Sequence, residues 1–102
     1  MDDKTAFHPE PASTVNLAVT NASGRVQLAG TAGASKAVRV VNKGSADVFV
    51  EFGSSTVVAT TATGMIIPAN QTEVFEVGLA THMAAITAAS TATLYATSGV
   101  GL

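Results

Sequence analysis

Residues 36–53, KAVRVVNKGSADVFVEFG, decide the fold. Two runs of alternating apolar residues flank Asn42-Lys43-Gly44, which signals a turn because Asn and Gly accept the backbone angles that a reversal needs. Alternation with period two is typical of a half-buried strand. The stretch therefore predicts two antiparallel strands joined as a hairpin, with these core-facing residues: Val38, Val40, Val48, Val50 and Phe52.

The opposite face of the same hairpin carries apolar residues where water is expected. Val41 and Phe49 fall on that face, beside two carboxylates. The segment TEVFEV at residues 72–77 repeats the pattern, because it places Val74 on a nominally wet face. A β-bulge would reverse these assignments, and singly exposed apolar residues are ordinary. The other interpretation is that this face contacts a subunit or a partner.

The rest of the chain is rich in residues that favour strands. Val and Thr suit a pleated surface, and Gly, Asn, Ser and Pro interrupt the apolar runs roughly every 8–12 residues. Residues 78–90 leave a short helix open, but Ile86 and Thr87 favour a strand. Candidate strands are residues 14–19, 24–29, 36–42, 46–52, 56–60, 65–67, 72–77, 82–87 and 91–97. We therefore expect an all-β fold, an antiparallel β-sandwich or jelly-roll-like domain of eight or nine short strands.

The first thirteen residues differ from the rest. Pro9 and Pro11 remove backbone donors and bias the preceding residues to extended geometry. We expect residues 1–13 to form an extended N-terminal arm, with Phe7 docking on a partner, and residues 14–102 to form the sandwich; a disordered tail is the alternative. The opening MDDKTAF is acidic where a secretory signal is basic, so the protein is expected to be made and kept in a cytosol.

Composition excludes several functional classes. The 102 residues suit one domain, the net charge is −2, and the five Lys and Arg residues do not cluster, so neither nucleic acid nor a membrane surface is an expected partner. No apolar run is long enough for a membrane helix. The chain has no Cys, which excludes disulfides and thiolate chemistry.

No residue pattern predicts catalysis, a metal site or a cofactor. His8 and His82 lie in different segments without the spacing of metal ligands. Glu73 and Glu76 are three apart, which sends them to opposite faces of a strand. The sequence therefore predicts that the protein is not an enzyme. Its low content of charged residues, 12%, instead favours an assembled protein.

Three segments carry a resemblance to a known group of proteins: RVVNKGSADVFVEFG (39–53), IPANQTEVFEV (67–77) and MAAITAASTATLYATSGVG (83–101). Together they resemble the small β-rich proteins encoded beside the major capsid gene of tailed bacteriophages. The resemblance covers about two-thirds of the chain and includes no catalytic motif. It implies a head decoration, or cement, protein that binds the outside of a capsid and bridges its subunits.

The resemblance implies specific partners and a location. The partners are the major capsid protein and further copies of the chain, as a homo-oligomer with a trimer favoured and a dimer possible. The location is the virion surface, after synthesis in the bacterial cytoplasm. Phage tail or neck components remain open, as does a receptor- or carbohydrate-binding module, although one Tyr and no Trp suit sugar stacking poorly. The residues expected at a capsid or subunit contact are Phe7, His8, Pro9, Val41, Phe49 and Val74.

Overall fold

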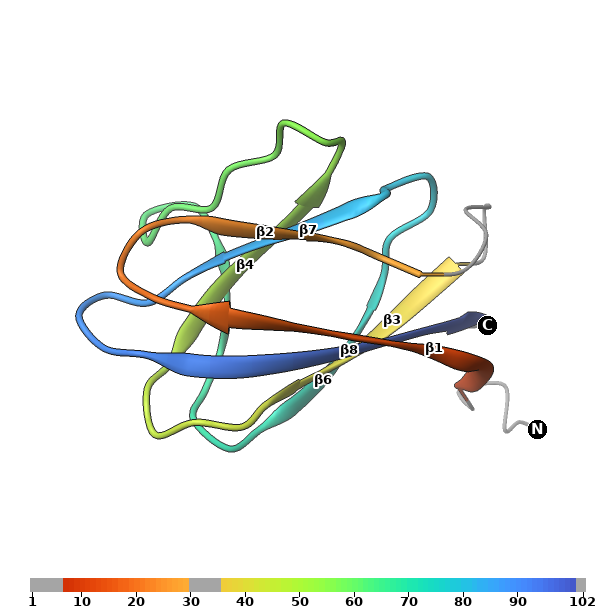
Figure 1. Cartoon of the computed structure of the whole chain (residues 1–102), viewed down its shortest axis with the longest axis horizontal. Coiled ribbons are helices and arrows are strands. Elements are labelled where there is room, and N and C mark those ends of the chain that lie inside the picture. The colour runs from red at the N-terminus through yellow and green to blue at the C-terminus, as the bar shows by residue number, and fades with distance from the viewer. Residues whose placement is uncertain (1–6, 30–35, 101–102) are drawn as a thin grey trace.

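The computed structural model describes residues 7–29 and 36–100, which form eight strands and no helix. Figure 1 shows the strands stacked in two layers. The strands are β1 (His8–Val19), β2 (Gly24–Gln27), β3 (Lys36–Asn42), β4 (Val48–Gly53), β5 (Met65–Ile67), β6 (Thr72–Glu76), β7 (His82–Ile86) and β8 (Ala92–Val100).

The strands build two four-stranded antiparallel sheets. Sheet A has the order β1-β8-β3-β6 and sheet B the order β2-β7-β4-β5. Of the consecutive strands in the described part of the chain, only β4 and β5 are hydrogen-bonded neighbours; every other connection crosses between the sheets. This strand order is that of a jelly roll, so the expected all-β sandwich is confirmed.

Most predicted strands lie where the sequence placed them, and one does not. The strand predicted at residues 82–87, in preference to a short helix, is confirmed as β7. The candidate strand at residues 56–60 is wrong, because the chain there makes turns and an irregular connection between β4 and β5.

The expected hairpin at residues 36–53 is also wrong, because β3 belongs to sheet A and β4 to sheet B. The turn between them carries the chain from sheet A to sheet B, and the fully buried Asn42 holds this connection in place. Its Nδ2 donates to the carbonyls of Ala46 at 2.9 Å, Ile67 at 3.0 Å and Pro68 at 3.2 Å. Alternation could not reveal the crossing, because strands in opposite sheets of a sandwich share one core and show the same pattern.

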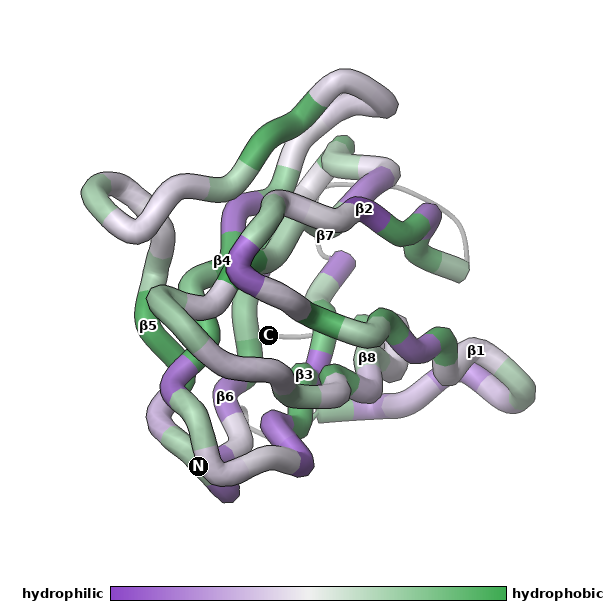
Figure 2. The backbone as a smooth tube through the Cα atoms, turned by 60° about the vertical axis from the view of Figure 1, so that its left-hand side comes forward, coloured by the Kyte–Doolittle hydropathy of each residue, from purple (hydrophilic) through white to green (hydrophobic). Residues whose placement is uncertain are grey.

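The core lies between the sheets and confirms the predicted inward residues. Val38, Val40, Val48 and Val50 are fully buried, together with large side chains such as Met83 and Leu94. Phe52 of sheet B meets Phe75 of sheet A with their ring centroids 5.1 Å apart. At the edge of sheet B, β5 is hydrophobic along its length (Figure 2).

Strand β1 begins earlier than expected. His8 pairs with Val100 and Pro9 with Gly99, and the register then shifts before resuming at Thr14. The irregular stretch includes Ala12, which has φ +57°. The next residue, Ser13, is buried, and its hydroxyl donates to the Ser98 carbonyl at 2.8 Å. The two prolines are thus accommodated by a bulge at a sheet edge, where missing donors are tolerated. Residues 8–13 of the expected arm join sheet A, and residues 1–6 lie outside the described residues.

Candidate assembly surfaces

The outer face of sheet B is covered in part by its own chain. Residues 54–64, which we call the strap, run from β4 to β5 across this face, and three hydrogen bonds hold them. Arg25 Nη1 donates to the Val57 carbonyl at 2.9 Å, Ala59 N to Ser23 Oγ at 3.0 Å, and Thr63 Oγ1 to Glu51 Oε2 at 2.7 Å. Ala59 of the strap is buried as a result.

Phe49 lies beneath the strap. The register aligns it with Ile66 on one side and Ile86 on the other, which makes an apolar row across sheet B. Gly64 rests on this row: a Cβ at Gly64 would be 2.8 Å from Phe49 Cβ. Phe49 is therefore half-buried within the monomer, which explains an aromatic residue on a face that the sequence suggested was wet. Its contact with a partner stays a prediction.

The outer face of sheet A has no such cover among the described residues. Two cross-strand rows define this surface, which we call the bare face. They are Asn16-Tyr95-Val41-Thr72 and Thr14-Thr97-Arg39-Val74. Tyr95 is 41% exposed and Val74 52% exposed, while Val41 between them is half-buried.

The bare face brings together two of the predicted contact residues. Val41 pairs with Thr72, so Val74, two residues further along β6, is its diagonal neighbour on the same face. Tyr95, directly opposite Val41, was missed by the sequence reasoning. It alternates with the buried Leu94 and Ala96, and that signal could have placed it outward.

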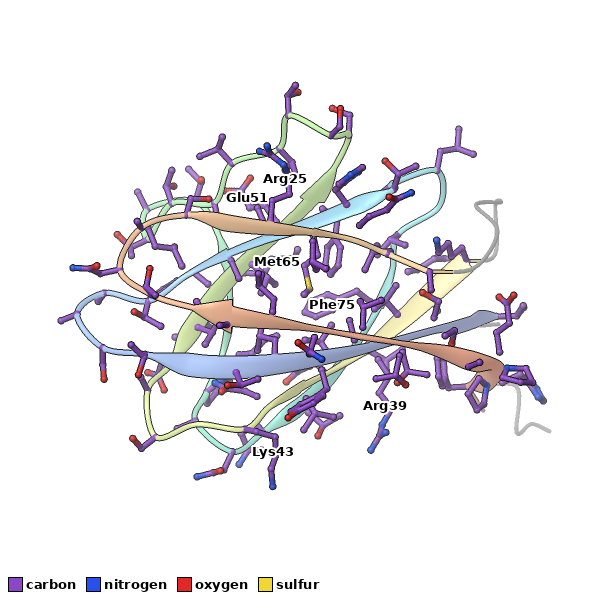
Figure 3. All side chains as sticks on the ribbon, viewed as in Figure 1. Arg25, Arg39, Lys43, Glu51, Met65 and Phe75 are labelled. Atoms are coloured by element: carbon purple, nitrogen blue, oxygen red, sulfur yellow. The ribbon has the colours of Figure 1, made fainter. Side chains whose placement is uncertain are left out.

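The charges on the bare face have one sign along β3. Arg39 is in β3 and Lys43 follows its end; Figure 3 shows both side chains extending away from the sandwich. Residues 14–18, 39–43 and 93–97 contain no carboxylate, but Glu76 of β6 pairs with Ala37 and so lies on the same outer face as Val74 and Arg39. The face is therefore apolar and hydroxyl-bearing at its centre, with basic residues along β3 and a carboxylate on β6.

The other predicted contact residues lie at the far end of sheet A. His8 and Pro9 are exposed. The Phe7 ring packs on the chain's own Gly99, since a Cβ there would lie 2.9 Å from Phe7 Cζ. The six predicted residues thus fall into three places: the end of sheet A, the bare face and the strapped face.

The described residues offer no group of three His, Asp or Glu side chains that could hold a metal ion. His8 is in sheet A and His82 in sheet B. Within the same ranges no helix is long and apolar enough to cross a membrane. The exposed apolar surfaces are the candidate functional features of the described residues.

Comparisons with known proteins match the fold rather than the sequence. No protein-family model matches the chain, and no curated protein matches it in sequence. One similar solved structure comes from the disulfide-linked pili that form Bacillus endospore appendages. It has TM-score 0.52 and 16% identity, and covers 87% of this chain and 83% of that one. The crystal structure of PirA has TM-score 0.52 and 11% identity, and covers 88% and 95%. At these identities the likeness establishes a shared fold.

The interpretation as a phage head decoration protein is wrong. Two chains that share this fold over most of their length come from endospore pili and PirA, not from a capsid. The interpretation fails together with its tail, neck and receptor-binding alternatives, its major capsid partner, its trimer and its location on the virion. The segments behind the resemblance are alternating strands ended by small turn residues, and the jelly roll accounts for them without a capsid.

Proposed function

We propose that this protein is a structural subunit that associates non-covalently with copies of itself to build a surface appendage. The bare face carries the proposal, because an exposed Tyr95 and Val74 flank Val41 on the outer surface of a four-stranded sheet. Aromatic residues at the centre of such a patch contribute most of the binding energy in many interfaces.

Two further observations support self-association. Lys, Arg, Asp and Glu together make up 12% of the chain, about half the usual share, so little charge repulsion opposes packing of copies. The fold is shared with a protein of endospore pili. Those pili are disulfide-linked, whereas this chain has no Cys, so its contacts cannot be disulfides and are expected to be insensitive to reducing agents.

The test is sedimentation of the purified chain over a wide concentration range, with electron microscopy of the same samples. The wild type is expected to form assemblies that persist in reducing agent. Tyr95→Glu should raise the concentration needed for assembly at least tenfold while leaving the melting temperature nearly unchanged. Thr61→Glu, an exposed substitution on the strap, is the matched control and should assemble normally. A wild type that is monomeric throughout would refute the proposal.

A further inference from the structure

A pocket of about 430 Å³ opens at one end of the sandwich, where three connections between strands meet. These connections join β1 to β2, β3 to β4 and β7 to β8, and Figure 1 shows them gathered at the left-hand end of the molecule. The pocket lies outside the two rows that define the bare face. Its lining includes Ala18, Lys43, Gly44, Ser45, Thr91 and Ala92.

The pocket is lined mostly by small side chains, and the turns that form it pack closely against one another. A Cβ at Gly44 would lie 2.7 Å from Ala92 Cβ, so the β3–β4 turn sits directly on the start of β8. The backbone N of Lys43 donates to the Thr93 carbonyl at 2.9 Å and fixes this turn in place. Among the lining residues Lys43 is charged and no carboxylate is present. The pocket therefore offers small apolar walls, hydroxyls and a positive rim.

The opposite end of the molecule carries a protruding apolar side chain. Leu79 is 79% exposed, more than any other large apolar side chain of the described residues. It lies in the turn between β6 and β7, which Figure 1 shows at the right-hand end. Glu76, at the end of β6, is exposed and three residues away, within about 11 Å along the chain.

The Leu79 turn is held rigidly against both sheets. The backbone N atoms of Val77 and Gly78 donate to the Lys36 carbonyl of sheet A at 2.9 and 3.3 Å. Thr81 N donates to the Gly53 carbonyl of sheet B at 3.0 Å. Gly78 has φ +58°, which sets the direction of the turn. A protruding residue fixed in this way loses little entropy when it docks.

We infer that the Leu79 turn of one copy docks in the end pocket of the next copy, with the Glu76 carboxylate paired to the Lys43 ammonium. The inference rests on the proposed self-association and names a contact for it. An exposed apolar side chain near a carboxylate stands at one end and an apolar pocket with a lysine at the other, and these ends are far apart in a molecule 41 Å long. A contact between two different surfaces that does not close on itself produces an open row of subunits.

A charge exchange tests the pairing. Lys43→Glu and Glu76→Lys are each expected to raise the concentration for row formation at least tenfold, and the two changes in one chain should restore it. Both residues are exposed, so circular dichroism and melting should match the wild type in all three variants. A double variant that assembles no better than the single variants would overturn the pairing.

A mixing experiment tests the head-to-tail arrangement. Leu79→Asp removes the protruding apolar side chain and keeps the pocket. Ser45→Trp fills the pocket and keeps the Leu79 side chain. Each variant alone should form no head-to-tail rows, and a one-to-one mixture should join two subunits end to end and extend no further in that direction. Rows from either variant alone would overturn the inference while leaving the proposed function intact. A wild type that never assembles would refute the proposed function, and this inference with it.

Discussion

The outer faces of the two sheets differ in how far the chain itself covers them. Sheet B carries an apolar row through Phe49 and covers Phe49 with residues 54–64 of its own chain, while Ile66 at the sheet edge stays 49% exposed. Sheet A carries Tyr95 and Val74 in the open. An apolar residue on an outward strand face is therefore not by itself a sign of a partner. It points to one only where the chain provides no cover.

The largest expected effect concerns Asn42, which holds the crossing between the two sheets. Asn42→Asp replaces a donor to three carbonyls with a buried carboxylate that donates nothing. We expect a loss of roughly 3–5 kcal/mol of stability at neutral pH. Chemical denaturation measures the loss. Asn16→Asp on the exposed bare face is the control and should change stability by less than about 0.5 kcal/mol. Equal effects would mean that the crossing does not depend on Asn42.

Phe49→Glu separates the strapped face from the bare face. Because Phe49 is half-buried under Gly64, a carboxylate there should cost about 2–4 kcal/mol of folding stability in the monomer. Tyr95→Glu should leave folding stability unchanged within about 0.5 kcal/mol and weaken association instead. Thermal melting and sedimentation of both variants distinguish the two effects. A Phe49→Glu variant that melts normally but fails to assemble would show that Phe49 is a contact residue after all.

Gly64→Ala tests the closeness of the strap. An added Cβ would lie 2.8 Å from both Phe49 Cβ and the Thr60 carbonyl oxygen, so the strap must shift. We expect a loss of about 1–3 kcal/mol and faster proteolysis within residues 54–64. Gly24→Ala is the matched control, since its nearest contact would be an ordinary 3.5 Å to Leu17 Cδ1. Identical proteolysis of the two variants would contradict the tight packing.

The sequence predicted the strands and their inward faces, because local alternation depends only on which side of a strand is buried. Val38, Val40, Val48 and Val50 are the clearest cases. It did not predict sheet membership, since Lys36–Asn42 and Val48–Gly53 look like a hairpin whichever sheet each joins. That choice is made by contacts distant in sequence, such as those of the Asn42 amide with Ile67 and Pro68.

The candidate surfaces were predicted in part. Val41 and Val74 do lie together on the bare face, because alternation sets the face of each residue. The covering of Phe49 was missed because residues 54–64 have no periodic pattern, and an irregular segment gives no sign in the sequence of the surface it crosses. The end pocket was missed for the same reason, since connections between several strands create it.

The smallest expected effect compares one arginine from each face. Arg25 Nη1 donates to the Val57 carbonyl of the strap, whereas the Arg39 side chain on the bare face makes no hydrogen bond or ion pair within the described residues. Arg25→Ala should therefore cost about 0.5–1 kcal/mol, the usual net value of one hydrogen bond, and hasten amide exchange in residues 54–64. Arg39→Ala should change neither quantity measurably. Hydrogen exchange by mass spectrometry resolves the two cases, because loss of the Arg25 bond acts on the strap before it acts on the whole fold. If exchange in residues 54–64 were the same in both variants, the strap would be held by packing on Phe49 alone, and the guanidinium would be an incidental contact.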